Sequence, residues 1–349
     1  MNRNDDNVSV NPSKPIDRRD LLRRGVTMGA AGAALALGAT PKVGAQSVDT
    51  PTPGDIAILR FLAAAELVED DLWAQYCELA VNNPGYNRAL TNIDPSLVRY
   101  ICDDRRDELS HARLINAYLV SIGQQPVNLD PFRTLPGSRV VGSSRVGRLT
   151  NLSRLRVDTS WFNRYREEGN PDFGDSFPQL VNIVNRPTIP TVPNTNAAGM
   201  QVLAHTAAFH FCAIEQGGSS LYAHLVTRVV SRTAARILAS IGPTEFYHFA
   251  VFQTSLEGLF GLNAGGGLLF PNLRGMPAIA RSVMPAPCTF LDRRFPDCSI
   301  VRPTNANNAG AVAAATGLVN SGLFTGQSQA FFNAVSALAT AADQANPGF

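Results

Sequence analysis

Lysine is almost missing from this chain, since Lys14 and Lys42 are the only lysines among its 349 residues. Its absence after residue 42 excludes a lysine Schiff base, an anchor for pyridoxal phosphate and the lysine of a phosphate-binding loop. Net positive charge is also lacking, because residues 46–349 carry 23 basic and 24 acidic side chains. A nearly neutral chain offers no electrostatic footprint for nucleic acid, so we expect no nucleic-acid partner.

Cysteine is scarce and its spacing is irregular. The cysteines are Cys77, Cys102, Cys212, Cys288 and Cys298. No two of them form a Cys-x-x-Cys pair, which argues against a zinc site. In an oxidising compartment Cys288 could join Cys298 across a short loop. The alternative, equally compatible with the sequence, is that all five are small buried side chains.

The first 45 residues have the pattern of an export signal. Arg18-Arg19-Asp20-Leu21-Leu22 resembles the twin-arginine signal of bacterial export, and an Ala/Gly-rich run follows over residues 25–39. Val43-Gly44-Ala45 is a small-residue cleavage site, which predicts a mature chain from Gln46. The alternative interpretation is a membrane anchor, but the Ala/Gly-rich run is too short and too poor in large apolar residues to span a bilayer comfortably. We therefore expect a periplasmic or secreted protein without a stable membrane span after cleavage.

A short motif, Glu-x-x-His, occurs twice, as Glu108-Leu-Ser-His111 and as Glu245-Phe-Tyr-His248. Positions i and i+3 of an α-helix lie about 60° apart around the axis and about 4.5 Å along it, so each motif presents a carboxylate and an imidazole on one face. A lone glutamate in an apolar helical stretch, Glu66 or Glu215, precedes each motif. The ordinary alternative is a pair of helices with exposed Glu and His, but the flanking residues are apolar.

Four helices follow from the apolar periodicity, over residues 56–80, 94–122, 198–230 and 231–262. We expect Asp55 to be the N-cap of the first helix and Asp94-Pro95 to open the second. Glu69 lies about 60° around the first helix from Glu66 and could be a second carboxylate, but it is expected to face solvent. The histidines outside the motifs lie on other helix faces and are expected to be peripheral: His205, His210 and His224.

Three further side chains are candidates for a supporting role near the motifs. Asp104 precedes Glu108 by four residues and is placed to accept a hydrogen bond from an imidazole. Tyr118 follows His111 by two helical turns, although simple aromatic packing is its more ordinary interpretation. Tyr222 lies on the inner stripe of the third helix. No catalytic residue is assigned.

Two features interrupt the helical pattern. Gly217-Gly218 costs the third helix about 1 kcal/mol per glycine, which is reasonable where a site needs space. Gly242-Pro243 stands just before Glu245, so the fourth helix is expected to bend there or to restart, which puts full occupancy by two metals in doubt. Gly265-Gly266-Gly267 lacks the context of a phosphate-binding loop.

These observations predict an all-α protein with three parts: a signal peptide (1–45), a four-helix bundle (54–262) with a long crossover between its second and third helices (123–198), and a Gly/Pro-rich extension with a terminal helix (263–349). Some local structure is expected around residues 158–166 of the crossover. The terminal helix, over residues 328–343, should dock on the bundle or on a partner subunit, which leaves a homo-oligomer open.

Over residues 54–262 the chain resembles the ferritin-like superfamily, and the long crossover, leader and Pro/Gly-rich extension are most similar to its desiccation-related branch. The resemblance implies a four-helix bundle with two metal ions, Glu108 and Glu245 bridging them. The implied ligands are Glu66, Glu108, His111, Glu215, Glu245 and His248.

Elementary chemistry agrees with that ligand set. Four carboxylates in an apolar interior repel one another, and two divalent cations balance them. Oxygen-rich ligation with one imidazole per metal suits iron or manganese. Such a pair could reduce dioxygen or peroxide, so we expect an oxidase or peroxide-consuming role in stress protection. The alternative is a non-catalytic desiccation or stress-related structural or binding protein that keeps the bundle. A nutrient-iron store is less well supported, because nothing indicates cage assembly.

Overall fold

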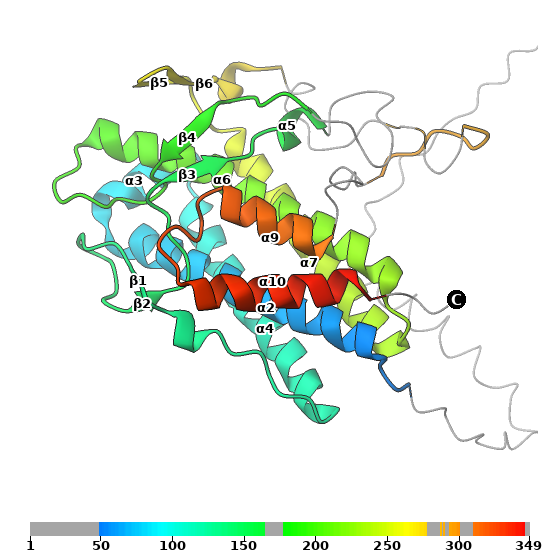
Figure 1. Cartoon of the computed structure of the whole chain (residues 1–349). Helices are drawn as coiled ribbons and strands as arrows, with labels where there is room; N and C mark the ends of the chain where they lie inside the picture. The colour runs from blue at the N-terminus through cyan, green and yellow to red at the C-terminus, as the bar shows by residue number, and fades with distance from the viewer. Residues whose placement is uncertain are drawn as a thin grey trace, which may run out of the picture. The chain divides into compact units, whose positions relative to one another are not determined.

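The computed structural model describes residues 49–164, 177–277, 287, 289, 293–300 and 310–345. The described part is mostly helical, which is compatible with the expected all-α class (Figure 1). Its α-helices are α2 (Pro53–Asn82), α3 (Pro84–Thr91), α4 (Leu97–Ser121), α5 (Trp161–Arg164), α6 (Ala197–Leu225), α7 (Arg232–Leu256), α9 (Ala311–Asn320) and α10 (Gln329–Asp343). The expected signal peptide lies outside the described residues.

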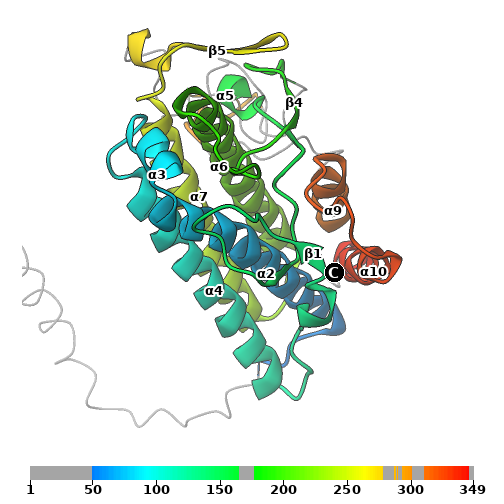
Figure 2. The ribbon, with the colours of Figure 1, turned by 90° about the vertical axis from the view of Figure 1, so that its left-hand side faces the viewer.

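The four long helices, α2, α4, α6 and α7, lie side by side (Figure 2). A disulfide between Cys77 and Cys102 joins α2 to α4, which run antiparallel. The Tyr76 hydroxyl lies 2.8 Å from Nδ1 of His210, and Tyr222 donates a hydrogen bond to Glu66, so α6 is antiparallel to α2 as well. It follows that α4 and α6 point the same way, and the chain must return along their length between them.

That return is the crossover, residues 122–196. Two small antiparallel sheets lie in it, β1 (Leu135–Pro136) with β2 (Gly147–Arg148) and β3 (Leu155–Val157) with β4 (Ile183–Arg186). Buried Asp71 on α2 accepts hydrogen bonds from the backbone N–H groups of Leu149 and Thr150, both at 2.9 Å, and pairs with Arg133. These bonds hold the crossover against α2.

The helix starts differ in detail from the expectations. Thr52, not Asp55, is the N-cap of α2, and Asp55 is the N3 partner in a capping box. The Asp55 carboxylate also accepts hydrogen bonds from the N–H groups of Val230, at 2.7 Å, and Ser231, at 3.2 Å. The beginning of α2 is thereby tied to the beginning of α7.

Pro243 does not interrupt its helix. After the N-cap Ser231, α7 runs unbroken from Arg232 to Leu256, so of the two expected alternatives, a bend or a restart beside Glu245, the restart is wrong. The stretch before α4 is also more ordered than expected, because Asn83 caps the short helix α3 and α4 begins only at Leu97.

The C-terminal part holds more structure than the predicted loops. A hairpin of β5 (Leu262–Gly265) and β6 (Leu268–Phe270) uses the three consecutive glycines, whose φ angles are 73°, 60° and 80°, to turn. Helix α9 was not expected, whereas α10 matches the predicted terminal helix and packs on α2. The short 3-10 turns are η1 (Asp130–Phe132), η2 (Val226–Arg228) and η3 (Leu273–Gly275).

Helix α6 is the core helix of this arrangement. Together with η2 it is the one described helix long and apolar enough to cross a membrane, yet 72% of its most apolar window is buried inside the protein. This is how the central helix of a packed helical protein behaves, because its apolar faces are covered by other helices.

The cysteine expectations are corrected by the Cys77–Cys102 disulfide. Cys212 is buried and Cys298 is exposed, so the interpretation of five small buried side chains is wrong. Cys288, and with it the suggested Cys288–Cys298 bond, lies outside the described residues.

Replacing both Cys77 and Cys102 with serine should lower the free energy of unfolding by roughly 3 kcal/mol, because a cross-link restricts the unfolded chain. Urea denaturation followed by circular dichroism measures the change. Cys298→Ser is the matched control and should stay within about 0.5 kcal/mol of the wild type, since Cys298 is exposed. Equal stability of the double variant and the wild type would contradict the disulfide.

Candidate metal centre

Two adjoining clusters of buried carboxylates and imidazoles lie between the four long helices, and each could hold a metal ion. The first cluster consists of Glu66, Glu108, His111 and Glu245. The second cluster consists of Asp104, Glu108, Glu215 and His248. Within each cluster, one potential ligand atom per residue lies within 4.8 Å of all the others. All six predicted ligands are therefore brought together, and Asp104 joins them.

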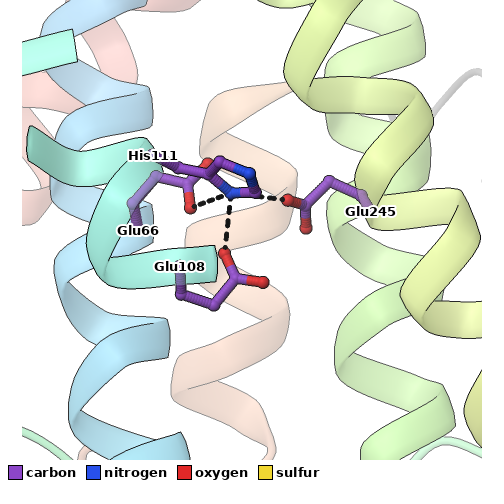
Figure 3. Close-up of side chains that lie close together, drawn as sticks. All are labelled: Glu66, Glu108, His111 and Glu245. Atoms are coloured by element: carbon purple, nitrogen blue, oxygen red, sulfur yellow. Dashed lines mark hydrogen bonds and ion pairs between the residues drawn. The ribbon is translucent and has the colours of Figure 1, made fainter. Parts of the chain in front are cut away.

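In the first cluster three carboxylates surround one ring nitrogen (Figure 3). Nδ1 of His111 lies 3.3 Å from Oε2 of Glu66, 3.2 Å from Oε2 of Glu108 and 3.3 Å from Oε1 of Glu245. One imidazole N–H cannot donate well to three acceptors at once. The arrangement therefore suits a cation that all four groups can approach.

The second cluster repeats this geometry around the other motif histidine. Nδ1 of His248 lies 2.9 Å from Oδ1 of Asp104, 3.0 Å from Oε1 of Glu108 and 3.3 Å from Oε2 of Glu215. The outer nitrogen, Nε2, lies 3.2 Å from Oδ2 of Asp107. An outer carboxylate of this kind fixes the orientation of a metal-binding imidazole and increases its basicity.

Glu108 spans the two clusters, since its Oε2 faces His111 and its Oε1 faces His248. This is the geometry of a bridging carboxylate. Glu245 does not match it, because it belongs to the first cluster alone. Its Oε2 points instead toward Gly218, where a Cβ atom would lie only 2.5 Å away. The space expected beside Gly218 is thus used by Glu245.

Two aromatic donors hold the carboxylates of α2 and α6. Nε1 of Trp73 donates to Oε1 of Glu215 at 3.1 Å, and the hydroxyl of Tyr222 donates to Oε1 of Glu66. Each donor follows the glutamate of its own helix by seven residues, or about two turns. Because α2 and α6 are antiparallel, this offset places each donor level with the glutamate of the other helix.

Most oxygens of the clusters lack ordinary hydrogen-bond partners. The atoms without a hydrogen bond among the described residues include Glu66 Oε2, Asp104 Oδ1 and Oδ2, Glu108 Oε1, Glu215 Oε2, both oxygens of Glu245 and His248 Nδ1. Buried polar atoms normally have partners, and leaving one unsatisfied costs about 1–3 kcal/mol. Hard, oxygen-preferring cations would satisfy these atoms, so the residues present fit a pair of metal ions.

The pKa values of the cluster residues indicate that the buried carboxylates lack compensating positive charge. Burial, and then the charge of Glu108, raises the pKa of Glu66 to about 8. Burial is also the largest cause that raises the pKa of each other carboxylate in the two clusters. For His111 burial acts to lower the pKa, but hydrogen bonds to its glutamates outweigh burial and raise the pKa to about 12. The pKa of His248 is raised by its carboxylate neighbours in the same way.

The supporting residues meet the expectations only in part. Tyr222 contacts the first cluster, whereas Tyr118 is half-buried beside Ser231 and Thr233 at the beginning of α7 and does not reach either cluster. Glu69, expected to face solvent, is half-buried, and burial together with the cluster glutamates raises its pKa well above the usual range.

The peripheral histidines lie outside both clusters, as expected. His205 bonds to the backbone carbonyl of Phe260 and His210 to Tyr76. Trp73 and Asp107 contribute to the clusters but were not predicted from the sequence. The offset of seven residues between Glu66 and Trp73 could have indicated the role of Trp73. The residues around Asp107 contain no pattern that indicates its contact with His248.

Comparison with known proteins finds no matching family model, no matching curated protein and no matching solved structure. The fold and the site therefore define the class of protein by themselves: a mostly helical protein with two buried, adjoining groups of carboxylates and histidine that could hold metal ions.

Alanine substitutions at the adjacent glycines of α6 should have different effects. Gly217 is exposed with nothing within 4 Å of an added Cβ, so Gly217→Ala should raise the free energy of unfolding by up to about 1 kcal/mol. Gly218→Ala should gain less or lose stability, because its Cβ would displace Glu245 Oε2. Urea denaturation of the metal-free variants measures both, and equal gains would contradict the close approach.

Raising the pH from 6.5 to 8 should lower the melting temperature of the metal-free protein. The folded Glu66 carboxyl keeps its proton up to about pH 8, whereas the unfolded one releases it near pH 4.5, so rising pH favours unfolding. His111, with its pKa raised from 6.5 to about 12, acts in the same direction. His210, with its pKa lowered from 6.5 to about 3, acts in the opposite direction only below pH 6.5 and is excluded by this window.

Glu66→Gln is the control for this experiment, since glutamine cannot titrate. Melting curves of the chelator-treated proteins should show a smaller fall between pH 6.5 and 8 for this variant than for the wild type. A wild-type melting temperature that increases over this interval would contradict the raised pKa values of Glu66 and His111.

Proposed function

We propose that this chain is a ferritin-like protein of the desiccation-related type, whose four long helices form a bundle around a pair of iron or manganese ions. The two adjoining clusters that share Glu108 carry the proposal. The helix directions support it, because α4 and α6 are parallel and joined by a long crossover, as in ferritin-like bundles.

In this proposal the protein side chains hold and orient the ions. Glu108 would hold both ions, while Glu66 and Glu215 would each hold one and are kept in place by Tyr222 and Trp73. His111 and His248 each supply one imidazole nitrogen. The apolar core around the clusters excludes bulk water, which strengthens every electrostatic interaction within them.

The ion pair would supply redox equivalents for the reduction of a small oxidant such as dioxygen or peroxide. An oxidase or peroxide-consuming activity in stress protection is therefore the function that this site supports best. The donor set favours iron or manganese over thiolate-preferring metals, because it contains carboxylates and imidazoles and no cysteine.

We further propose export through the twin-arginine route to the periplasm or the cell exterior. The Cys77–Cys102 disulfide supports this location, because disulfides persist in oxidising compartments and are rare in the cytosol. Export of a folded chain would also allow the metal to be loaded before translocation.

Elemental analysis of the purified protein, reconstituted with Fe²⁺ or Mn²⁺, tests the proposal. The wild type should bind two ions per chain, and Glu108→Gln should lose both, because Glu108 faces both clusters. Glu257→Gln is the matched control, since Glu257 stands at the C-cap of α7 outside the clusters, and should keep both ions. A chelator should lower the melting temperature of the wild type and of this control.

Absorption spectra before and after addition of peroxide then test the redox role. The loaded wild type should change its spectrum and consume peroxide, and Glu108→Gln should do neither. A folded wild type that binds no metal, and whose melting temperature ignores chelators, would replace this proposal with the non-catalytic protective or binding protein.

A further inference from the structure

The two halves of the helical core repeat one pattern. Each half contributes a glutamate, an aromatic hydrogen-bond donor seven residues later, and a Glu-x-x-His motif on the next long helix. The first half comprises Glu66, Trp73, Glu108 and His111, and the second comprises Glu215, Tyr222, Glu245 and His248. Equal halves would be expected to build two equivalent metal positions.

The repetition fails one helical turn before each motif glutamate. Four residues before Glu108 stands Asp104, whereas four residues before Glu245 stands Ile241. Both side chains are buried, each at 3% exposure. One half of the core therefore places an acid where the other half places an apolar residue.

Asp104 is aimed at the second cluster and has no other described partner. Neither carboxylate oxygen makes a hydrogen bond among the described residues, and Oδ1 lies 2.9 Å from Nδ1 of His248. The same nitrogen faces Glu108 and Glu215. If Nδ1 binds an ion, it has no proton to donate, so a carboxylate at this distance must face the ion too.

The task of orienting the imidazole belongs to another residue. Asp107, 52% exposed, lies 3.2 Å from the outer nitrogen of His248 and is placed to accept its N–H. Asp104 approaches the inner nitrogen instead. In the second cluster it occupies the place that Glu245, turned toward Gly218, leaves open.

We propose that Asp104 is a direct ligand of the ion at His248, so that the two metal positions are inequivalent. The proposal rests on the metal pair of the proposed function. The position at His111 takes its second terminal carboxylate from α7, through Glu245, whereas the position at His248 takes it from α4, through Asp104. The centre then has seven protein ligands, five of them carboxylates.

Binding of Mn²⁺ by Asp104→Asn tests the proposal. Asparagine keeps the shape and an oxygen acceptor but removes the negative charge, so a mere hydrogen-bond partner would be replaced with little effect. The variant should bind one Mn²⁺ per chain in equilibrium dialysis, and filling the second position should need more than about a hundredfold higher free Mn²⁺, beyond the loss usual for an outer partner.

Asp103→Asn is the matched control. Asp103 is the adjacent residue, but it pairs on the surface with Arg99 and Arg106, where ion pairs contribute little. This variant and the wild type should bind two Mn²⁺ and give the electron paramagnetic resonance spectrum of a spin-coupled pair. Asp104→Asn at the same free Mn²⁺ should give the spectrum of an isolated ion.

The outcomes distinguish failure of direct ligation by Asp104 from failure of the metal pair itself. Two ions and a coupled spectrum in Asp104→Asn, as in Asp103→Asn, would overturn direct ligation by Asp104 and leave the metal pair intact. No bound Mn²⁺ in the folded wild type would overturn the pair and the ligand together.

A second measurement does not depend on the folding of the variant. Wild-type protein given one equivalent of Mn²⁺ should hold an isolated ion in clearly more than half of its chains, because equivalent and independent positions give one half, whereas inequivalent positions fill in order. A proportion of one half or less would overturn the ordered filling that inequivalent positions require.

Discussion

Negative charge gathered in an apolar interior is the constraint on which this structure depends. Five carboxylates from four helices converge on two imidazoles, surrounded by aromatic packing such as the stack of Trp73 on Phe252, with ring centroids 5.0 Å apart. Buried charges are costly unless opposite charge accompanies them. Protons or cations must therefore enter the core together with these side chains, and a cation that binds only the folded state stabilises it.

The helices are held in position by contacts outside the clusters, so the carboxylates cannot relieve their repulsion by moving apart. The Cys77–Cys102 disulfide fixes α2 against α4, Asp55 ties the beginning of α2 to that of α7, and Asp71 binds the crossover to α2. Burial, and then the repulsion between neighbouring carboxylates, instead raises the pKa values of the buried acids. A scaffold of this kind would keep the oxygen and nitrogen atoms of both clusters arranged for an ion before one binds.

Local periodicity made the motif residues predictable, because Glu and His at i and i+3 share a helix face in any helix. The positions of the supporting aromatic residues depend on how the helices pack, which the sequence does not show. Tyr118 follows His111 by two turns on the inner stripe, but α4 carries it about 10 Å along the axis, to the beginning of α7. Trp73 and Tyr222 also follow a glutamate of their own helix by two turns, yet they do reach the clusters. Because α2 and α6 are antiparallel, Trp73 lies level with Glu215 and Tyr222 lies level with Glu66.

The start of helix α9 could not be predicted from the residues next to it. Its N-cap is Gly310, which provides no side-chain bond, and its first N–H groups are satisfied by Asp343, whose oxygens lie 2.8 Å from the nitrogen of Ala311 and 2.9 Å from that of Val312. A cap supplied from the far end of α10 leaves no signal near the start of the helix. Likewise, Gly218 predicted that space was needed, but only the packing of α6 on α7 shows that Glu245 uses it.

The clusters are not equally enclosed on all sides. Helix α10 packs on α2, and the cluster glutamates of α2 and α6, Glu66 and Glu215, are at most 1% exposed. His111 on α4 and His248 on α7 are 8% and 6% exposed, and beyond His248 lies Asp107, half in solvent. The centre therefore comes nearest to the surface between α4 and α7, where an acid already stands against an imidazole.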